Sequence, residues 1–137
     1  LAKNLSKKKT QIISIFTKNL YDKAPKSKYF SEIIITKDLS SRNELIIDKS
    51  DVFIALPGGV GTLNEILEVI NKNLLNEINK KIYLINDNLF WTPLEELFKS
   101  LVKKKLLDQK KLKKNFKVCK LEQLKDEFKK RYAKSRS

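Results

Sequence analysis

The chain of 137 residues contains no histidine, no methionine and a single cysteine. Without histidine it cannot form a Ser-His-Asp triad, a Cys-His dyad or a His-ligated metal site. The lone thiol, Cys119, excludes an internal disulfide and a zinc site built from several cysteines, and it is expected to be a small buried hydrophobe. No apolar run approaches the roughly 18 residues of a membrane span. We therefore expect a cytoplasmic protein that holds no metal and has no membrane partner.

Arginine is also scarce, although the chain is strongly basic. It has 27 Lys and 3 Arg, with a net charge of +14. Residues 99–137 carry 14 Lys and 2 Arg against four acidic residues, a net charge of +12. Such a segment fits either a nucleic-acid or acidic-membrane patch, or a solvated helical surface. Because base and phosphate recognition favours the planar fork of arginine, the lysine excess favours the solvated surface and argues against nucleic acid as a partner.

Short apolar runs recur along the chain and indicate strands. They cover residues 12–16, 33–36, 52–56 and 82–85, with a weaker candidate at 116–121. Continuous apolar runs of this length are typical of strands buried on both faces of a parallel sheet. Helical periodicity is found between them, over residues 39–49, 62–75, 92–107 and 121–133. This alternation predicts an α/β protein with a Rossmann-like open parallel sheet and helices on both faces.

Local signals predict where some of these elements begin and end. Ser40 or Ser41 is expected to cap the helix over 39–49, and Thr92 the helix over 92–107, with Pro93 at its first position. Residues 21–29, with Pro25 and several lysines, are expected to form a loop. We expect one domain over residues 1–137, ending in a basic helix at about 121–137. The lack of methionine indicates a removed N-terminus or a piece of a longer chain, and the domain is expected to lack its first strand-helix unit.

All three glycines of the chain, Gly58, Gly59 and Gly61, lie in one turn between an expected strand and an expected helix. Glycines in such a turn indicate unusual dihedrals or the close approach of another group. In an open α/β sheet these turns lie at the carboxyl ends of strands, where ligands bind, and a helix N-terminus attracts phosphate. The turn lacks the lysine of a Walker A loop and the third glycine of a dinucleotide-binding loop. A tight structural turn and a phosphate cradle fit these residues about equally well.

The string P-G-G-V-G-T-L-N-E, from Pro57 to Glu65, is more specific. It resembles the P-G-G-x-G-T-x-x-E signature of the LOG (LONELY GUY) family, cytokinin-activating phosphoribohydrolases that are often mislabelled as lysine decarboxylases. The family also has an Arg-Lys pair fifteen residues before the first proline, where this chain has Arg42 and Asn43. The resemblance extends from about residue 38 to 101, and more loosely to residue 121. Lys72 stands where the family usually has Trp, and the family's earlier glycine-rich segment has no counterpart here.

The resemblance implies hydrolysis of the N-glycosidic bond of a nucleoside 5′-monophosphate, such as AMP or an N6-modified AMP. The products are a free base and ribose 5-phosphate. It assigns Arg42 and Glu65 as the catalytic pair, and Gly58, Gly59, Val60, Gly61 and Thr62 as the phosphate-binding loop. Glu65 is expected on the first turn of its helix. The resemblance also implies a homodimer that needs no cofactor.

Two other functions remain open. Asn43 and Lys72 fit a non-catalytic nucleotide-binding module that keeps the phosphate loop. The charge of residues 99–137 fits a protein associated with nucleic acid. Phe90 and Trp91 are expected to be core or interface aromatics rather than groups that stack on a base. Decarboxylation is rejected, because it generally uses pyridoxal phosphate on a lysine within a much larger fold, and no lysine here has a distinctive context.

Overall fold

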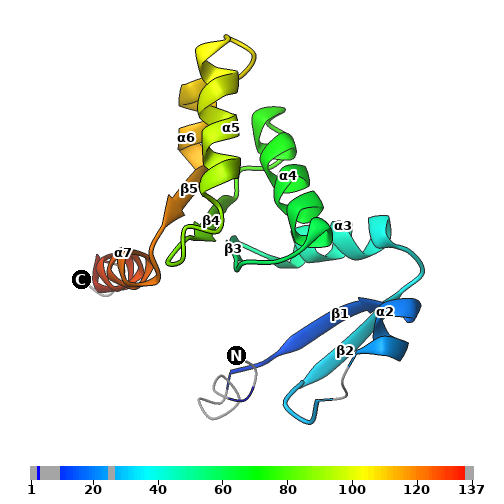
Figure 1. Ribbon diagram of the computed structural model, residues 1–137. Coiled ribbons are helices and arrows are strands. Elements are labelled where there is room, and N and C mark those ends of the chain that lie inside the picture. Colours follow the sequence, from blue (N-terminus) through cyan, green and yellow to red (C-terminus); the bar gives the residue numbers. More distant parts are fainter. Residues whose placement is uncertain (1–2, 4–9, 25–26, 135–137) are drawn as a thin grey trace. The chain divides into compact units, whose positions relative to one another are not determined.

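The computed structural model describes residues 3, 10–24 and 27–134, and these form parallel strands flanked by helices (Figure 1). The chain divides into two compact units, Leu1–Ser50 and Asp51–Ser137. The first contains a two-stranded sheet and the second a three-stranded sheet. This arrangement confirms the α/β class with parallel strands. None of the described helices is both long and apolar enough to span a bilayer.

In the first unit, strand β1 (Ile13–Thr17) pairs in parallel with strand β2 (Glu32–Thr36). Helix α2 (Lys18–Lys23) follows β1 directly, so the expected loop over 21–29 was wrong at its start. Its Tyr21 ring packs edge-on against Phe16 at a centroid distance of 5.8 Å, a tertiary contact that the local pattern does not contain. Pro25 lies outside the described residues.

Helix α3 (Leu39–Lys49) completes this unit and has the predicted bounds. Its N-cap is Asp38, rather than Ser40 or Ser41, because the Asp38 carboxylate accepts a hydrogen bond of 2.8 Å from the Ser41 amide. The same bond lowers the pKa of Asp38. The helix therefore begins at Leu39, two residues earlier than a cap at Ser40 would allow.

The second unit is built on strands β3 (Val52–Ala55), β4 (Lys81–Ile85) and β5 (Phe116–Cys119), which are all parallel and lie in that order. Helix α4 (Val60–Leu74) connects β3 to β4. Helices α5 (Thr92–Lys103) and α6 (Gln109–Asn115) connect β4 to β5, and α7 (Leu121–Lys134) follows β5. All five expected strands are thus confirmed.

The helix bounds correct three expectations. Helix α4 begins at Val60, two residues before the expected start. Trp91 is the N-cap of α5, so Thr92 is its first residue and Pro93 its second. Helix α5 ends at Lys103 rather than continuing to residue 107. Of the expected C-terminal helix, residues 135–137 lie outside the described residues.

The early end of α5 has a clear cause in its backbone. Lys105 has a φ of 60°, and its amide donates to the Val102 carbonyl at 3.0 Å. The Leu106 amide donates to the Leu101 carbonyl at 2.9 Å, which completes a Schellman cap. Helix α4 ends in the same way, with Asn76 at a φ of 59°. Neither cap contains the glycine that usually marks such an end.

Strand β4 lies at the centre of the second unit's core. All four residues from Ile82 to Ile85 are buried, so both faces of this strand are covered. Burial of both faces explains the uniformly apolar run. On one face Tyr83 and Ile85 pack against Leu124 of α7. On the other face, α4, α6 and Phe98 of α5 contact β4 or β5. Cys119 of β5 is buried with Tyr83, Ile85 and Leu124, as expected for a small buried hydrophobe, and burial raises the pKa of its thiol.

Candidate functional site

The glycine loop leaves the carboxyl end of β3 and leads into α4. Strand β3 ends at Ala55 and α4 begins at Val60, so residues 56–59 form the whole connection. Leu56, Gly59 and Val60 are exposed. Ligands of open α/β sheets bind at this edge of the sheet. The structure therefore places the predicted phosphate-binding residues where a ligand can reach them.

The three glycines of this loop differ in what they do for the fold. None of them, all being in the described part of the chain, has a positive φ, so unusual dihedrals do not explain them. A Cβ on Gly58 would lie 2.4 Å from Oγ1 of Thr62, so close approach explains this position. A Cβ on Gly59 or Gly61 would meet no atom within 4 Å. Contacts within the described residues therefore require glycine at one position and leave open space at the other two.

The partial positive charge at the N-terminus of α4 is not offset by a capping side chain or by an acidic residue in the first turn. The N-cap is Gly59, which has no side chain to accept a hydrogen bond from the first amides. The first turn contains no acidic residue that would offset the helix dipole. Amides without an intrahelical partner and a partial positive charge together favour an anion such as phosphate. Thr62 adds a hydroxyl in the same turn.

Glu65 lies on the second turn of α4, because the helix begins two residues earlier than expected. It follows Gly61 by four residues, and residues with this spacing lie on the same face of a helix. Its side chain is half-buried. The described structure thus brings the glycine loop and Glu65 together at one end of one helix.

Arg42 lies on α3, in the first unit. Its Nε atom donates a 2.9 Å hydrogen bond to the carbonyl of Ile15 in β1, and its side chain is half-buried. Arg42 is therefore an anchored residue and not a free surface charge. Its neighbour Asn43 is buried, with 6% of its surface exposed. Arg42 and Glu65 belong to different units, so their pairing stays a prediction.

A second loop, residues 86–91, follows β4 and was not assigned to the site from the sequence. The Asn86 side chain accepts a 2.7 Å hydrogen bond from the Trp91 amide and donates one of 3.2 Å to Oγ1 of Thr92. Trp91 is buried, as expected for a core aromatic. Phe90 is 48% exposed, which a core residue would not be. The sequence pattern could have assigned this loop to the site, because the loop directly follows an apolar run that predicts a buried parallel strand.

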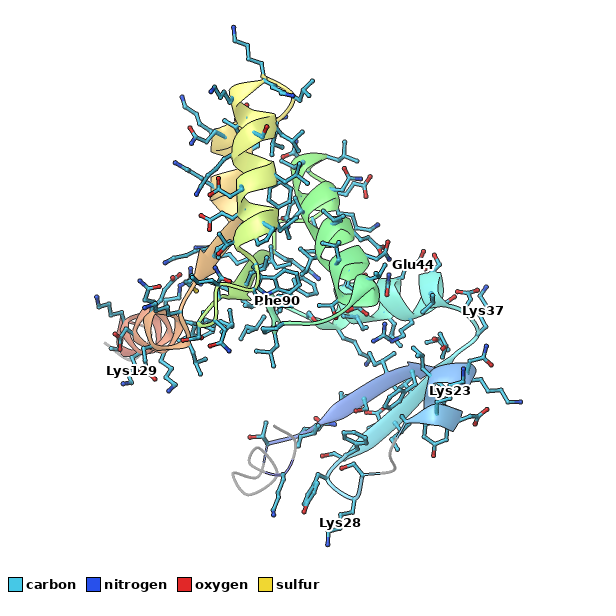
Figure 2. All side chains as sticks on the ribbon, in the orientation of Figure 1. Lys23, Lys28, Lys37, Glu44, Phe90 and Lys129 are labelled. Carbon is cyan, nitrogen blue, oxygen red and sulfur yellow. The ribbon has the colours of Figure 1, made fainter. Side chains whose placement is uncertain are left out.

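The basic residues of the C-terminal segment lie largely on helix surfaces. Every lysine of α6 is exposed, and Lys129 projects outwards from α7 (Figure 2). Several others form exposed ion pairs, such as Lys125 with Glu122. Among the described residues, no group of three or more acidic or cysteine side chains is placed to hold a metal.

Comparison with known proteins gives a family. The chain matches the family described as "Possible lysine decarboxylase" over residues 1–127. The cytokinin riboside 5′-monophosphate phosphoribohydrolase of Rhodococcoides fascians is 42% identical over 64 residues, which are 47% of this chain and 32% of that protein. Cytokinin riboside 5′-monophosphate phosphoribohydrolase LOG5 of Arabidopsis thaliana is 39% identical over 75 residues, 55% of this chain and 33% of that protein.

The cytokinin riboside 5′-monophosphate phosphoribohydrolase of Mycobacterium tuberculosis is 38% identical over 55 residues, 40% of this chain and 29% of that protein. The chain spans about a third of the length of the curated relatives it matches. The family match covers far more than half of the chain. The protein therefore belongs to this lysine-decarboxylase-like family, the LOG family of the curated phosphoribohydrolases.

Proposed function

We propose that the protein hydrolyses the N-glycosidic bond of a nucleoside 5′-monophosphate, releasing the free base and ribose 5-phosphate. The observation that carries this proposal is the glycine loop: it leaves a parallel strand, begins a helix with an uncompensated N-terminus, and has open space over Gly59 and Gly61. The names of the relatives support the same reaction.

In the proposed mechanism, the 5′-phosphate binds to the amides of Gly58, Gly59, Val60 and Gly61 and to the hydroxyl of Thr62. This binding places the ribose beside Glu65, one turn further along the same helix. The bond between C1′ and the base nitrogen breaks, and the ribose gains oxocarbenium character. The carboxylate of Glu65 stabilises that positive charge and orients the attacking water. The water oxygen bonds to C1′, and its proton passes to the leaving base.

Arg42 is proposed to complete the site with a permanent positive charge. A guanidinium stabilises either the phosphate or the negative charge that develops on the leaving base. Its Nε atom donates to the Ile15 carbonyl, so the side chain that carries this charge is anchored to β1.

The described residues do not fit a pyridoxal-phosphate decarboxylase. That chemistry needs a lysine that forms a Schiff base in a sheltered site. No lysine in the described part of the chain is buried. The word decarboxylase in the family's description therefore finds no support in these side chains, whereas the glycine loop suits a phosphorylated substrate.

The alternative is a nucleotide-binding module without catalysis. Asn43 supports it, because an uncharged and buried side chain stands where the family has lysine. Lys72 does not, because it lies in the last turn of α4, far along the helix from the loop, and pairs with Glu77 at 3.5 Å. The two functions make different predictions for turnover and the same prediction for binding.

The remaining proposals rest on the family. We propose a cytoplasmic homodimer, with residues 1–137 as part of one nucleotide-binding domain. A surface groove of about 480 Å³ between α4 and α5, lined by Leu67, Leu74 and Leu101, is the face we assign to the second copy. Sedimentation of a Leu67→Glu variant tests that assignment, with a monomer as the expected result.

The function is tested by measuring free base released from a panel of nucleoside 5′-monophosphates and from the matching nucleosides, with Glu65→Gln and Arg42→Ala variants. We expect release from the monophosphates only, and its collapse in both variants while nucleotide binding largely survives. Binding without release from the wild type would favour the non-catalytic module. Wild-type turnover in both variants would contradict the assigned catalytic pair.

A further inference from the structure

The loop after β4 lies beside the glycine loop. Strands β3 and β4 are parallel neighbours, and Ala55 at the end of β3 pairs with Leu84 near the end of β4. Neighbouring strands lie about 4.8 Å apart, so the connections that leave their carboxyl ends start side by side. A ligand whose phosphate binds at the glycine loop therefore extends within reach of residues 86–91.

This second loop is held in one conformation by its own hydrogen bonds. The side chain of Asn86, at the start of the loop, accepts a hydrogen bond from the Trp91 amide and donates one to Oγ1 of Thr92, where the loop ends. The Leu89 amide donates to the Asn86 carbonyl at 3.3 Å, and Leu89 has a φ of 58°. The loop thus fixes the position of the residue that follows, Phe90, which lies between β4 and α5 (Figure 2).

The Phe90 ring is exposed although it is aromatic and well held. Its centroid lies 4.8 Å from that of Trp91, at an interplanar angle of 90°. In an edge-to-face pair, at least one face of the Phe90 ring is free of its partner. Phe90 is 48% exposed and Leu89 is 68% exposed, so two apolar side chains face solvent at this edge of the sheet.

Trp91 provides an independent observation. Its side chain is 4% exposed, and its Nε1 atom has no hydrogen-bond partner among the described residues. A buried donor without an acceptor is rare. The indole against which Phe90 packs is therefore held by packing and not by a hydrogen bond of its own Nε1 among the described residues.

We propose that Phe90 stacks on the base of the bound nucleoside 5′-monophosphate and so determines specificity for an aromatic base, with Trp91 positioning its ring. This inference rests on the proposed function, because it takes the phosphate to be at the glycine loop. It reverses the expectation that Phe90 is a core or interface aromatic. The phosphate end and the base end of the substrate are then read by the loops after two adjacent strands.

The test separates the two ends of the substrate. Trp91 is the only tryptophan of the chain, so its fluorescence reports on the ring that contacts it. We expect AMP to change Trp91 emission, and ribose 5-phosphate, which has no base, to bind without that change. In Phe90→Leu we expect the Kd of AMP to rise about tenfold, as for a lost base–aromatic stack, while the Kd of ribose 5-phosphate changes by less than about twofold.

Matched variants exclude a merely structural effect. Phe90→Tyr keeps the ring and is expected to retain the affinity for AMP. Leu97→Ala removes a comparably exposed apolar side chain, 54% exposed on α5, and is expected to change neither affinity. Equal AMP affinity of wild type and Phe90→Leu would overturn the inference and leave the proposed function intact. A wild type that binds no monophosphate would overturn both. Dissociation of a dimer by Phe90→Leu, with unchanged affinity for AMP, would assign Phe90 to a subunit interface instead.

Discussion

The hydrogen bond between Tyr83 and Glu127 allows a quantitative test of the packing of α7 against the sheet. Tyr83 lies in the middle of β4 and is 1% exposed, and its hydroxyl donates to Oε1 of Glu127 on α7 at 2.6 Å. The change Tyr83→Phe removes this bond and keeps the ring. The variant therefore isolates one polar contact within an otherwise apolar face.

The expected loss of stability follows from the groups that remain. A hydrogen bond to a charged acceptor contributes about 1.5–3 kcal/mol. In the variant, Glu127 still contacts Lys117 at 2.9 Å and Arg131 at 3.3 Å, so its carboxylate is not left without partners. We therefore expect the lower part of this range, a decrease of about 1.5–2 kcal/mol in the free energy of unfolding at pH 7.

The same bond makes stability depend on pH in the alkaline range. Burial, together with the hydrogen bond to Glu127, raises the pKa of Tyr83 from 10.0 to about 12. The folded state favours the neutral phenol, so this contribution is complete below pH 10 and is lost as the pH rises from 10 to 12. Two pH units correspond to about 2–3 kcal/mol. On the acid side, the bond from Tyr83 and then that from Lys117 lower the pKa of Glu127, so its contribution is lost as the pH falls through the lowered value.

Urea unfolding followed by circular dichroism, at several pH values, measures this effect. We expect the wild type to exceed Tyr83→Phe in stability at pH 7, and the difference to vanish as the pH approaches 12. Tyr29→Phe, at a half-buried tyrosine of the other unit, is the matched control. Equal stability of wild type and Tyr83→Phe at pH 7, or a difference that stays constant through the alkaline range, would refute this account of the bond.

Three further predictions concern glycine. Gly58→Ala should destabilise the protein by about 1–3 kcal/mol in urea unfolding, because the new Cβ would lie 2.4 Å from Oγ1 of Thr62. Gly61→Ala should leave stability unchanged or raise it while phosphate binding, measured by titration calorimetry, is lost; binding at wild-type affinity would contradict the phosphate assignment. Lys105→Gly should raise the free energy of unfolding by about 1 kcal/mol, because Lys105 has a φ of 60° in the cap of α5. An unchanged or lower melting temperature would show that the lysine side chain contributes more than its backbone strain costs.

The strands were predictable because burial on both faces of a parallel sheet leaves an uninterrupted apolar run. Strand β4 is the clearest case, with Ile82 to Ile85 all buried. The ends of helices were less predictable, because they depend on hydrogen bonds that several residues can make. Asp38 caps α3 although two serines follow it, and Lys105 ends α5 without glycine or proline. The short helix α2 depends on the contact of Tyr21 with Phe16, which lies outside its local pattern.

The residues of the candidate site also differ in how far the sequence predicted them. The glycine loop and Glu65 were predictable, because a continuous string places them at the start of one helix. The loop after β4 was not, because its structure depends on how Asn86 bonds to Trp91 and Thr92 across the loop. The pairing of Arg42 with Glu65 comes from family resemblance alone, and it stays a prediction.

The distribution of glycine in this chain is itself an argument for a ligand. Asn76, Leu89 and Lys105 have positive φ, where glycine would relieve strain of about 1–2 kcal/mol in a residue such as leucine. All three glycines stand elsewhere, in the loop before α4. Gly61 is the second residue of α4, and no atom of the described residues would meet a Cβ there. A glycine that no contact within the described chain requires is best explained by a group that approaches its backbone from outside, and at a helix N-terminus that group is an anion.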